Sequence, residues 1–318
     1  MQYVGIQSQI WKNNFRSVFL IISFPAVIVG MVWLFLFLVQ RYASQTGIVN
    51  YAEIQEQFIQ AVPFVLLAVG IWFAIAWLSH TRMIQKATLS KPLTRKENMR
   101  VYNLVENLCM SRGLPVPRLN IIEDDSLNAF ASGISKKSYT ISLSRGIISK
   151  LDDDELEAVI AHELTHIMNK DVRLLIISVI FVGIFAFISH IAFRSLLFSG
   201  AGRSQKKNGF ILILILLAVG IIGYILSIVF RFALSRKREY LADAGAAELT
   251  KNPDALARAL RKISKDPWIE AVKRDDVAQM FIDHPTKKED SSSLNSMING
   301  IFATHPPVQK RIQILEQF

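Results

Sequence analysis

Four long apolar stretches divide the chain, and each is bounded by polar or charged residues. None of the four contains Lys, Arg, Asp or Glu, and His190 near the end of the third is read as a residue at the membrane interface. A helix of about 20 apolar residues spans the hydrocarbon core of a bilayer, so the pattern predicts four transmembrane helices. The first stretch is too long for a cleaved signal peptide and is soon followed by a second. The stretches are Ser17 to Gln40, Ala61 to Ser79, Leu174 to Phe193 and Phe210 to Phe230.

The remaining sequence predicts a domain of mixed α and β structure. Residues 94–112 have an amphipathic stripe typical of a helix, which Gly113 ends. Residues 118–123 and 139–144 are rich in β-formers and are separated by polar, glycine-containing sequence, which predicts two or three strands of a small sheet. The helical stripe consists of Tyr102, Val105, Leu108 and Cys109.

Three further helices are predicted outside the apolar stretches. Residues 151–169 begin with Asp152 as an N-cap and Glu155 three residues later, the pattern of a capping box. A second helix starts at Asn252-Pro253, and a short terminal helix follows His305. Residues 283–296 are polar and predict a loop. The inward faces are expected to carry Leu256, Leu260 and Ile263 in the second helix and Val308, Ile312 and Leu315 in the terminal one.

Composition supports a membrane protein and makes a nucleic-acid-binding protein improbable. The chain is 51% hydrophobic with a mean hydropathy of +0.32. Its net charge is +10, but Lys and Arg cluster beside the apolar stretches, where they face anionic headgroups. No zinc-finger spacing or RNA-recognition motif accompanies them, so nucleic acid is not an expected partner. Cys109 is the single cysteine, which excludes an intrachain disulfide and fits a reducing compartment.

The basic residues also predict an orientation. Lys12 and Arg16 precede the first stretch, and residues 82–96 after the second are strongly basic. By the positive-inside rule, both termini and the mixed domain lie in the cytoplasm. The loop between the third and fourth stretches argues against this, because it carries Arg194, Arg203, Lys206 and Lys207. Either the earlier helices fix the topology, or the third and fourth stretches form a shallow hairpin.

These patterns define a mainly α integral-membrane protein with four parts. Residues 1–80 form a first membrane hairpin, and residues 81–173 form the first part of the mixed domain. Residues 174–230 form a second membrane hairpin, after which residues 231–318 complete the mixed domain. A two-helix hairpin returns the chain to the face of the membrane that it left, so both parts of the domain meet there.

The predicted helix over residues 151–169 contains a metal-binding pattern. His162 and His166 are one turn apart and lie roughly 40° apart around the helix, with Glu163 about 60° to the side. Two imidazoles at this spacing can bind one zinc ion, and the carboxylate beside them can act as a general base. Chance would produce this pattern in such a chain on the order of one time in a hundred.

A catalytic zinc needs a third protein ligand and an open fourth position for water. Glu239, just after the fourth apolar stretch, is the best candidate. Asp243 is one turn further on the same face, where it can accept a hydrogen bond from a ligand histidine. Taken alone, a glutamate that follows an arginine is usually part of a surface ion pair, and the metal helix is what favours the ligand reading.

Together these residues resemble the HtpX-like membrane metalloproteases, which are relatives of the CAAX prenyl proteases. The resemblance covers essentially the whole chain. It implies a zincin-like α+β catalytic domain, Glu239 as the third ligand of one zinc ion, and cleavage of misfolded or membrane proteins in the bacterial inner membrane. The matching residues are His162, Glu163, His166, Asn169, Asp171, Glu239, Asp243, Thr304, His305, Pro306, Arg311 and the segment Asn128-Ala129-Phe130-Ala131.

The expected activity is a zinc-dependent endopeptidase with Glu163 as general base. His305 is a candidate oxyanion donor by its family position or, equally, a capping group before Pro306, and Tyr240 is a weaker candidate donor. Asn128 is expected to bind substrate backbone if the strand after it is an exposed edge. A CAAX-type protease is an alternative, although those relatives have more membrane helices. A membrane scaffold or transporter with an incidental metal site is another, although transporters place ionisable groups inside their spans.

Overall fold

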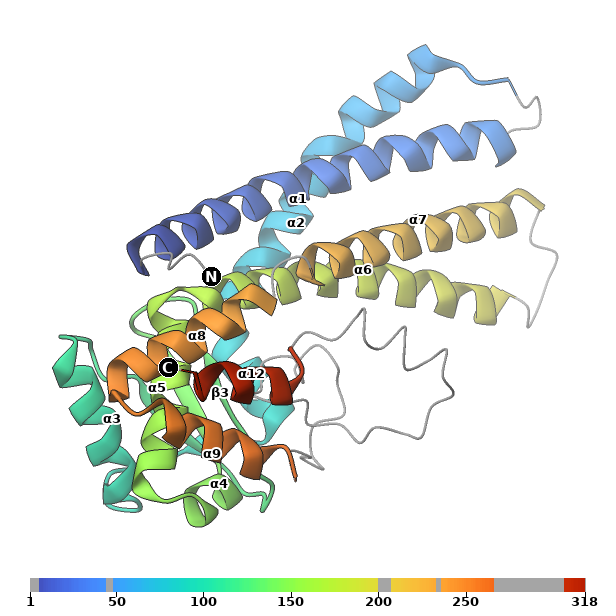
Figure 1. Cartoon of the computed structure of the whole chain (residues 1–318). Helices are drawn as coiled ribbons and strands as arrows, with labels where there is room; N and C mark the ends of the chain where they lie inside the picture. The colour runs from blue at the N-terminus through green and yellow to red at the C-terminus, as the bar shows by residue number, and fades with distance from the viewer. Residues whose placement is uncertain (1–5, 44–47, 200–206, 233–235, 266–305, 318) are drawn as a thin grey trace. The chain divides into compact units, whose positions relative to one another are not determined.

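The computed structural model describes residues 6–43, 48–199, 207–232, 236–265 and 306–317 (Figure 1). The chain forms two compact units, each assembled from segments that are distant in sequence. The helical unit consists of Phe15–Leu78 and Ile177–Ala233, and the mixed unit consists of Met1–Asn14, Ser79–Ile176 and Leu234–Phe318. The predicted loop over residues 283–296 lies outside the described residues.

Four long helices contribute to the helical unit. They are α1 (Ile6–Ala43), α2 (Tyr51–Thr88), α6 (Asp171–Ser199) and α7 (Lys207–Phe232). Among the described residues, three stretches are long and apolar enough to cross a membrane: Ile21–Tyr42, Tyr51–Thr88 and Asp171–Ile191. The apolar part of α7 that qualifies, Ile213–Ile225, is shorter. The predicted membrane helices are therefore present as helices, and a count of four full spans stays a prediction.

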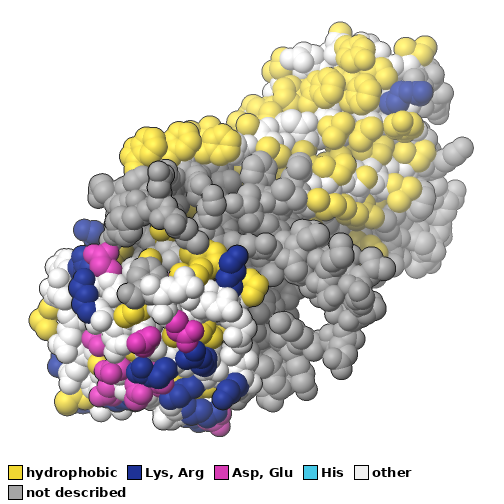
Figure 2. Space-filling view, in the orientation of Figure 1, with side chains coloured by type: hydrophobic (Ala, Val, Ile, Leu, Met, Phe, Trp, Pro, Cys, Tyr) yellow, Lys and Arg dark blue, Asp and Glu magenta, His cyan; other side chains and the backbone are white. Residues whose placement is uncertain are grey.

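The outer surface of the helical unit is apolar. Figure 2 shows hydrophobic side chains crowded over its visible described part, whereas Lys, Arg, Asp and Glu gather on the mixed unit. Phe64 is 75% exposed and Leu78 is 81% exposed, although both are large hydrophobic residues. Such a surface would be unstable in water and is typical of helices that face lipid.

The mixed unit contains a four-stranded sheet in the order β1-β2-β4-β3. The strands are β1 (Lys91–Pro92), β2 (Arg118–Ile122), β3 (Ala129–Ser132) and β4 (Thr140–Ser144). β2 and β4 are parallel, and β3 is the antiparallel terminal strand, with Ala131 opposite Ile141. The sheet thus has more strands than the two or three predicted, because the short β1 and the segment after Asn128 both pair.

A tight turn fixes the β3–β4 hairpin. Gly133 has φ +116°, and a Cβ there would lie 2.4 Å from the carbonyl oxygen of Ser138. Glycine is therefore required at this position. The Ser138 hydroxyl oxygen accepts hydrogen bonds from the backbone amides of Ile134 and Ser135, both at 3.0 Å, which closes the turn.

Two helices flank the sheet segments. α3 (Met99–Ser111) begins five residues later than predicted, because the Asn98 side chain caps it by accepting from the Val101 amide at 3.0 Å. Thr94 and Glu97 form a separate turn before it, in which the Thr94 amide donates to the Glu97 carboxylate at 2.7 Å. α4 (Arg145–Lys150), which the sequence pattern did not predict, follows β4 directly and is capped by Ser144.

The central helix is α5 (Asp153–Met168), and its predicted capping box is confirmed. The Asp152 side chain accepts from the Glu155 amide at 2.8 Å, and the Glu155 carboxylate accepts from the Asp152 amide at 3.1 Å. α5 packs against the sheet and against α8 (Arg236–Thr250) and α9 (Pro253–Ile263). α12 (Val308–Leu315) packs in turn on α8 and α9. These helices surround α5, so the polar side chains of His162, Glu163 and Thr165 lie inside the unit.

The inward faces predicted for the last two helices are confirmed. Leu256, Leu260 and Ile263 of α9 are fully buried, and Asn252 caps this helix by accepting from the Ala255 amide. In α12, Ile312 and Leu315 are buried and Val308 packs against the same core. Apolar packing therefore holds the terminal helix against the centre of the unit.

Candidate metal centre

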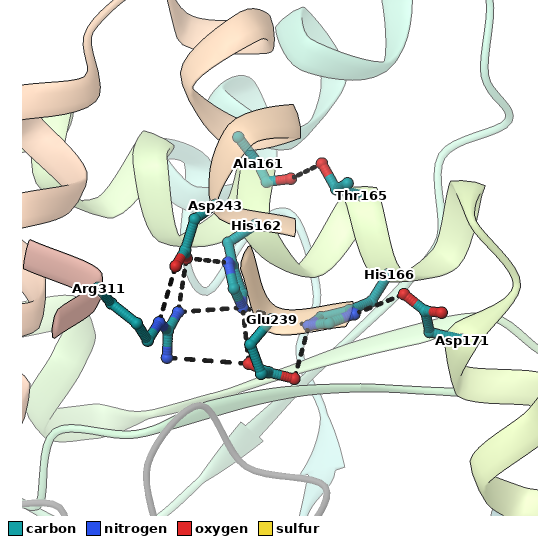
Figure 3. Close-up of polar contacts among 8 residues, drawn as sticks. All are labelled: Ala161, His162, Thr165, His166, Asp171, Glu239, Asp243 and Arg311. Atoms are coloured by element: carbon teal, nitrogen blue, oxygen red, sulfur yellow. Dashed lines mark hydrogen bonds and ion pairs between the residues drawn. The ribbon is translucent and has the colours of Figure 1, made fainter. Parts of the chain in front are cut away.

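α5 presents two imidazoles to the same point. His162 and His166 are one turn apart, and their Nε2 atoms are 3.2 Å from each other (Figure 3). His162 is completely buried, and the side chain of His166 is 13% exposed. The spacing seen in the sequence therefore brings both rings together in the way that a shared metal ion requires.

α8 brings a carboxylate to the same place. Glu239 Oε2 lies 3.7 Å from Nε2 of His162, and Glu239 Oε1 lies 3.6 Å from Nε2 of His166. One ligand atom of each of the three residues lies within 4.8 Å of the others. Among the described residues this is the group of His, Cys, Asp and Glu that could hold a metal ion.

The other nitrogen of each ring faces an aspartate. Nδ1 of His162 lies 3.0 Å from Oδ1 of Asp243, and Nδ1 of His166 lies 3.0 Å from Oδ2 of Asp171. A carboxylate next to Nδ1 favours the tautomer with its proton there, which leaves a lone pair on Nε2. Both lone pairs then point at one position beside the Glu239 carboxylate, where a cation would offset their repulsion.

The charges around the two histidines also favour a cation at this position. Burial opposes a positive charge on His166, but the carboxylates of Glu239 and Asp171 outweigh it and raise its pKa to about 10. Burial likewise opposes protonation of His162, whose pKa is nonetheless raised by Asp243 and Glu239. The centre therefore stabilises positive charge. Two imidazole nitrogens and one carboxylate are a donor set that fits zinc.

Glu163 lies next to this position on α5. It is 2% exposed, and burial raises the pKa of its carboxyl, with the nearby Glu239 adding to the effect. The two histidines and a hydrogen bond from the backbone of Ala131 in β3 act in the opposite direction. Glu163 thus stands between the metal-binding nitrogens and the terminal strand of the sheet.

Sequence reasoning gave Arg311 and Asp171 no role in the centre, although both belong to the resemblance. Arg311, 1% exposed on α12, donates from Nε and Nη2 to Asp243 at 2.8 and 2.7 Å. Its Nη2 is 3.5 Å from Nε2 of His162 and its Nη1 is 3.8 Å from Glu239 Oε2. Asp171 is at the start of α6, five residues after His166. Neither residue belongs to a local sequence pattern that would reveal these contacts.

The remaining predicted site residues are placed as follows. Asn128 is fully buried, and its side-chain oxygen accepts a hydrogen bond from the Ala129 amide at 3.0 Å. It directly precedes β3, the terminal strand of the sheet. Tyr240 is half-buried next to Glu239 on α8. His305 lies outside the described residues.

Comparisons with known proteins match most of the chain to one peptidase family. The sequence profile described as Peptidase family M48 matches residues 95–318. The chain is 56% identical to a Protease HtpX homolog of Bacteroides fragilis over 324 aligned residues, which cover 100% of both chains. It is 33% identical to a Protease HtpX homolog of Listeria monocytogenes, covering 97% of this chain and 98% of the relative. The crystal structure of S. mikatae Ste24p is similar with a TM-score of 0.47 and 19% identity, covering 96% of this chain and 66% of that longer one.

Proposed function

We propose a mechanism and a substrate class for this chain, which belongs to peptidase family M48 and is a membrane-associated zinc metallopeptidase. It acts as an endopeptidase on misfolded or membrane-embedded proteins and so serves membrane protein quality control. The observation that supports the mechanism is the convergence of two imidazole Nε2 atoms and the Glu239 carboxylate beside Glu163.

His162, His166 and Glu239 would hold one zinc ion per chain. When bound, zinc supplies a Lewis acid for the attacking water and for the scissile carbonyl. Asp243 and Asp171 hold the two rings in the orientation that this requires, since each lies 3.0 Å from an Nδ1 atom. The ligand histidines are thus fixed before substrate arrives.

Glu163 is the general base. It accepts a proton from the water as the water oxygen attacks the peptide carbonyl carbon. It then donates that proton to the leaving amine as the C–N bond breaks, so the carboxylate is regenerated. Burial of Glu163 excludes bulk water and keeps the proton between these partners.

Substrate is proposed to pair with β3. This strand ends the sheet among the described residues, and the Ala131 backbone bonds to Glu163. β3 is buried along its whole length, so a peptide can pair with it and pass Glu163 only after the residues that cover the strand move aside, with Asn128 at the start of the strand as a candidate contact. His305 remains the candidate oxyanion donor by its family position.

The covalent order of the chain supports substrates at the membrane. His166 is five residues before Asp171, where a stretch long enough to span a membrane begins. The proposed metal ligand His166 therefore lies only a few residues from the start of this stretch. The resemblance implies the bacterial inner membrane, and the basic flanks support a cytoplasmic location of both termini and the mixed unit.

A CAAX-type prenyl protease is the second candidate, because it shares the chemistry. The comparison that tests both uses purified protein with zinc, offered casein, an unfolded membrane protein and a farnesylated CAAX peptide. We expect hydrolysis of the two proteins. Cleavage confined to the farnesylated peptide would contradict the proposed substrate class and leave the mechanism standing.

Glu163→Gln tests the mechanism in the same assay. The amide keeps the shape of the side chain but cannot accept the proton of water, so we expect bound zinc with proteolysis reduced at least about a hundredfold. Near-normal proteolysis by verified Glu163→Gln protein would refute Glu163 as the base. A scaffold with an incidental metal would show no hydrolysis in either form.

A further inference from the structure

α8 contains a glycine where its surroundings favour alanine. Gly245 stands in the middle of the helix between Ala244 and Ala246, with Ala242 and Ala247 close by. Glycine within a helix is destabilising relative to alanine, because it exposes backbone and loses more conformational entropy on folding. A compensating reason for glycine should therefore be found in the packing around this position.

The reason lies on α5. A Cβ at position 245 would be 2.4 Å from Cγ2, 2.8 Å from Oγ1 and 3.2 Å from Cβ of Thr165. Thr165 is buried and precedes His166. Its hydroxyl donates to the Ala161 carbonyl at 2.8 Å (Figure 3), which holds the β-branched side chain in one rotamer. The methyl group of Thr165 is therefore held against α8 and cannot rotate away freely.

This contact controls the spacing of the two helices that carry the metal ligands. α5 carries His162 and His166, and α8 carries Glu239 and its neighbour Asp243. Ordinary van der Waals contact begins at 3.4 Å, so a methyl group on residue 245 would require a separation larger by about 1 Å. Metal-ligand distances tolerate changes of only about 0.2 Å. A shift of this size would therefore carry Glu239 away from the imidazoles.

We propose that Gly245 is a positioning residue of the metal centre: by lying directly against Thr165, it sets how closely α8 approaches α5 and hence where Glu239 meets His162 and His166. The inference rests on the proposed ligand set. It predicts that alanine at position 245, although it has the higher intrinsic helix propensity, weakens metal binding.

The test measures zinc affinity of the purified full chain by competition with a chromogenic chelator. Gly245→Ala should weaken binding by about ten- to a hundredfold, the range for residues that orient ligands. Thr165→Ala removes both atoms nearest to residue 245, and the Thr165 amide still bonds to Ala161 within the helix. The double variant Gly245→Ala/Thr165→Ala should therefore bind within about threefold of Thr165→Ala. The absorption spectrum of bound cobalt should change and recover in parallel.

Gly70→Ala is the matched control. It is also a glycine-to-alanine change within a helix, α2, but its Cβ would meet no atom within 4 Å. It should leave zinc affinity unchanged. Wild-type affinity in Gly245→Ala, or a folded double variant that is not restored, would overturn the inference.

Two further measurements distinguish a failure of this inference from a failure of the proposed function. If Gly245→Ala alone fails to fold, the double variant decides, because relief of the contact should restore both folding and zinc. Glu239→Ala is measured alongside. If Glu239→Ala loses zinc while Gly245→Ala does not, the role of Gly245 is refuted and the proposed metal centre stands. If the wild-type protein binds no zinc, both the metal centre and the role of Gly245 are refuted.

Discussion

Each imidazole of the centre is held by an aspartate at its Nδ1 atom. Nδ1 of His162 faces Asp243, and Asp243 is itself fixed by two hydrogen bonds from Arg311. Nδ1 of His166 faces Asp171. The ring orientations are therefore set by residues that would not touch the metal. Loss of a ligand and loss of an orienting carboxylate should consequently have different effects on metal binding.

Zinc binding should follow this division. His162→Ala, His166→Ala and Glu239→Ala each remove a ligand atom, so we expect little or no zinc in the purified protein. Asp243→Asn and Asp171→Asn keep the ligands but weaken their orientation, so we expect a loss of about ten- to a hundredfold in affinity. Metal analysis after dialysis against a weak chelator measures both classes. Stoichiometric zinc in Glu239→Ala would exclude it as the third ligand.

The candidate ligands were predictable where the geometry is local. The helical spacing of His162, Glu163 and His166 fixes their relative directions, and the position of Asp243 relative to Glu239 follows from the same periodicity. Arg311 reaches Asp243 across 68 positions of the chain, which periodicity does not determine. The contact between Asp171 and His166 was not predicted because Asp171 follows a helix break. Lys170 has φ +60° there, which redirects the chain back toward His166.

At the scale of elements, α12 is attached to the centre through one arginine. Arg311 is buried and pairs with Asp243 on α8, which joins the terminal helix to the helix of the third ligand. Arg261 and Glu316 form a second pair between α9 and the end of the chain, but both side chains are about half exposed. The two pairs therefore differ mainly in burial.

Removing one charge from each pair should show that difference. Arg311→Met leaves Asp243 as a buried charge that has lost its bidentate partner, at a cost of roughly 3–5 kcal/mol. Arg261→Met breaks an exposed pair worth about 0–1 kcal/mol. Calorimetric unfolding of the full chain in detergent should place the Arg311→Met midpoint on the order of 10 °C below that of Arg261→Met. Equal midpoints would show that α12 is held by its apolar contacts alone.

The elements were predicted best where apolar periodicity and a cap coincide. α5 has both, and its capping box and burial agree with the expectation. α3 was predicted too long, because its apolar stripe does not reveal that Thr94 and Glu97 bond to each other instead of entering the helix. β1 is a strand of two residues and contains Pro92, so no local pattern identifies it, and only pairing with β2 creates it.

At the scale of the whole molecule, the lengths of the apolar helices and the positions of the basic residues predict different membrane topologies. α6 begins with a stretch long enough to span, Asp171–Ile191, while the described apolar part of α7 that qualifies is shorter. Four positive charges lie between or at the ends of these helices, on the side that should be outside if both span. Burial of each CH₂ contributes about 0.8 kcal/mol, so two long apolar helices favour spanning by more than a charge bias opposes it.

Accessibility to a membrane-impermeant maleimide decides the topology. Three single cysteine variants suffice: Ile48→Cys between α1 and α2, Ser204→Cys between α6 and α7, and Lys137→Cys in the mixed unit. Cys109 can be retained as a silent background, because burial raises the pKa of its thiol to about 11 and leaves little reactive thiolate. We expect the first two variants to react in intact spheroplasts and Lys137→Cys to react only after the membrane is opened.

Each other outcome selects a different arrangement. Reaction of Ile48→Cys outside, with Ser204→Cys reacting only in opened membranes, would show that α6 and α7 form a shallow hairpin on the cytoplasmic side. The metal centre would be unaffected, because α5 and α8 lie on the same side of the membrane in either arrangement. Reaction of Lys137→Cys alone from outside would invert the orientation, since the mixed unit carries both halves of the centre. The protease would then act outside the cytoplasm, and its substrates would be sought there.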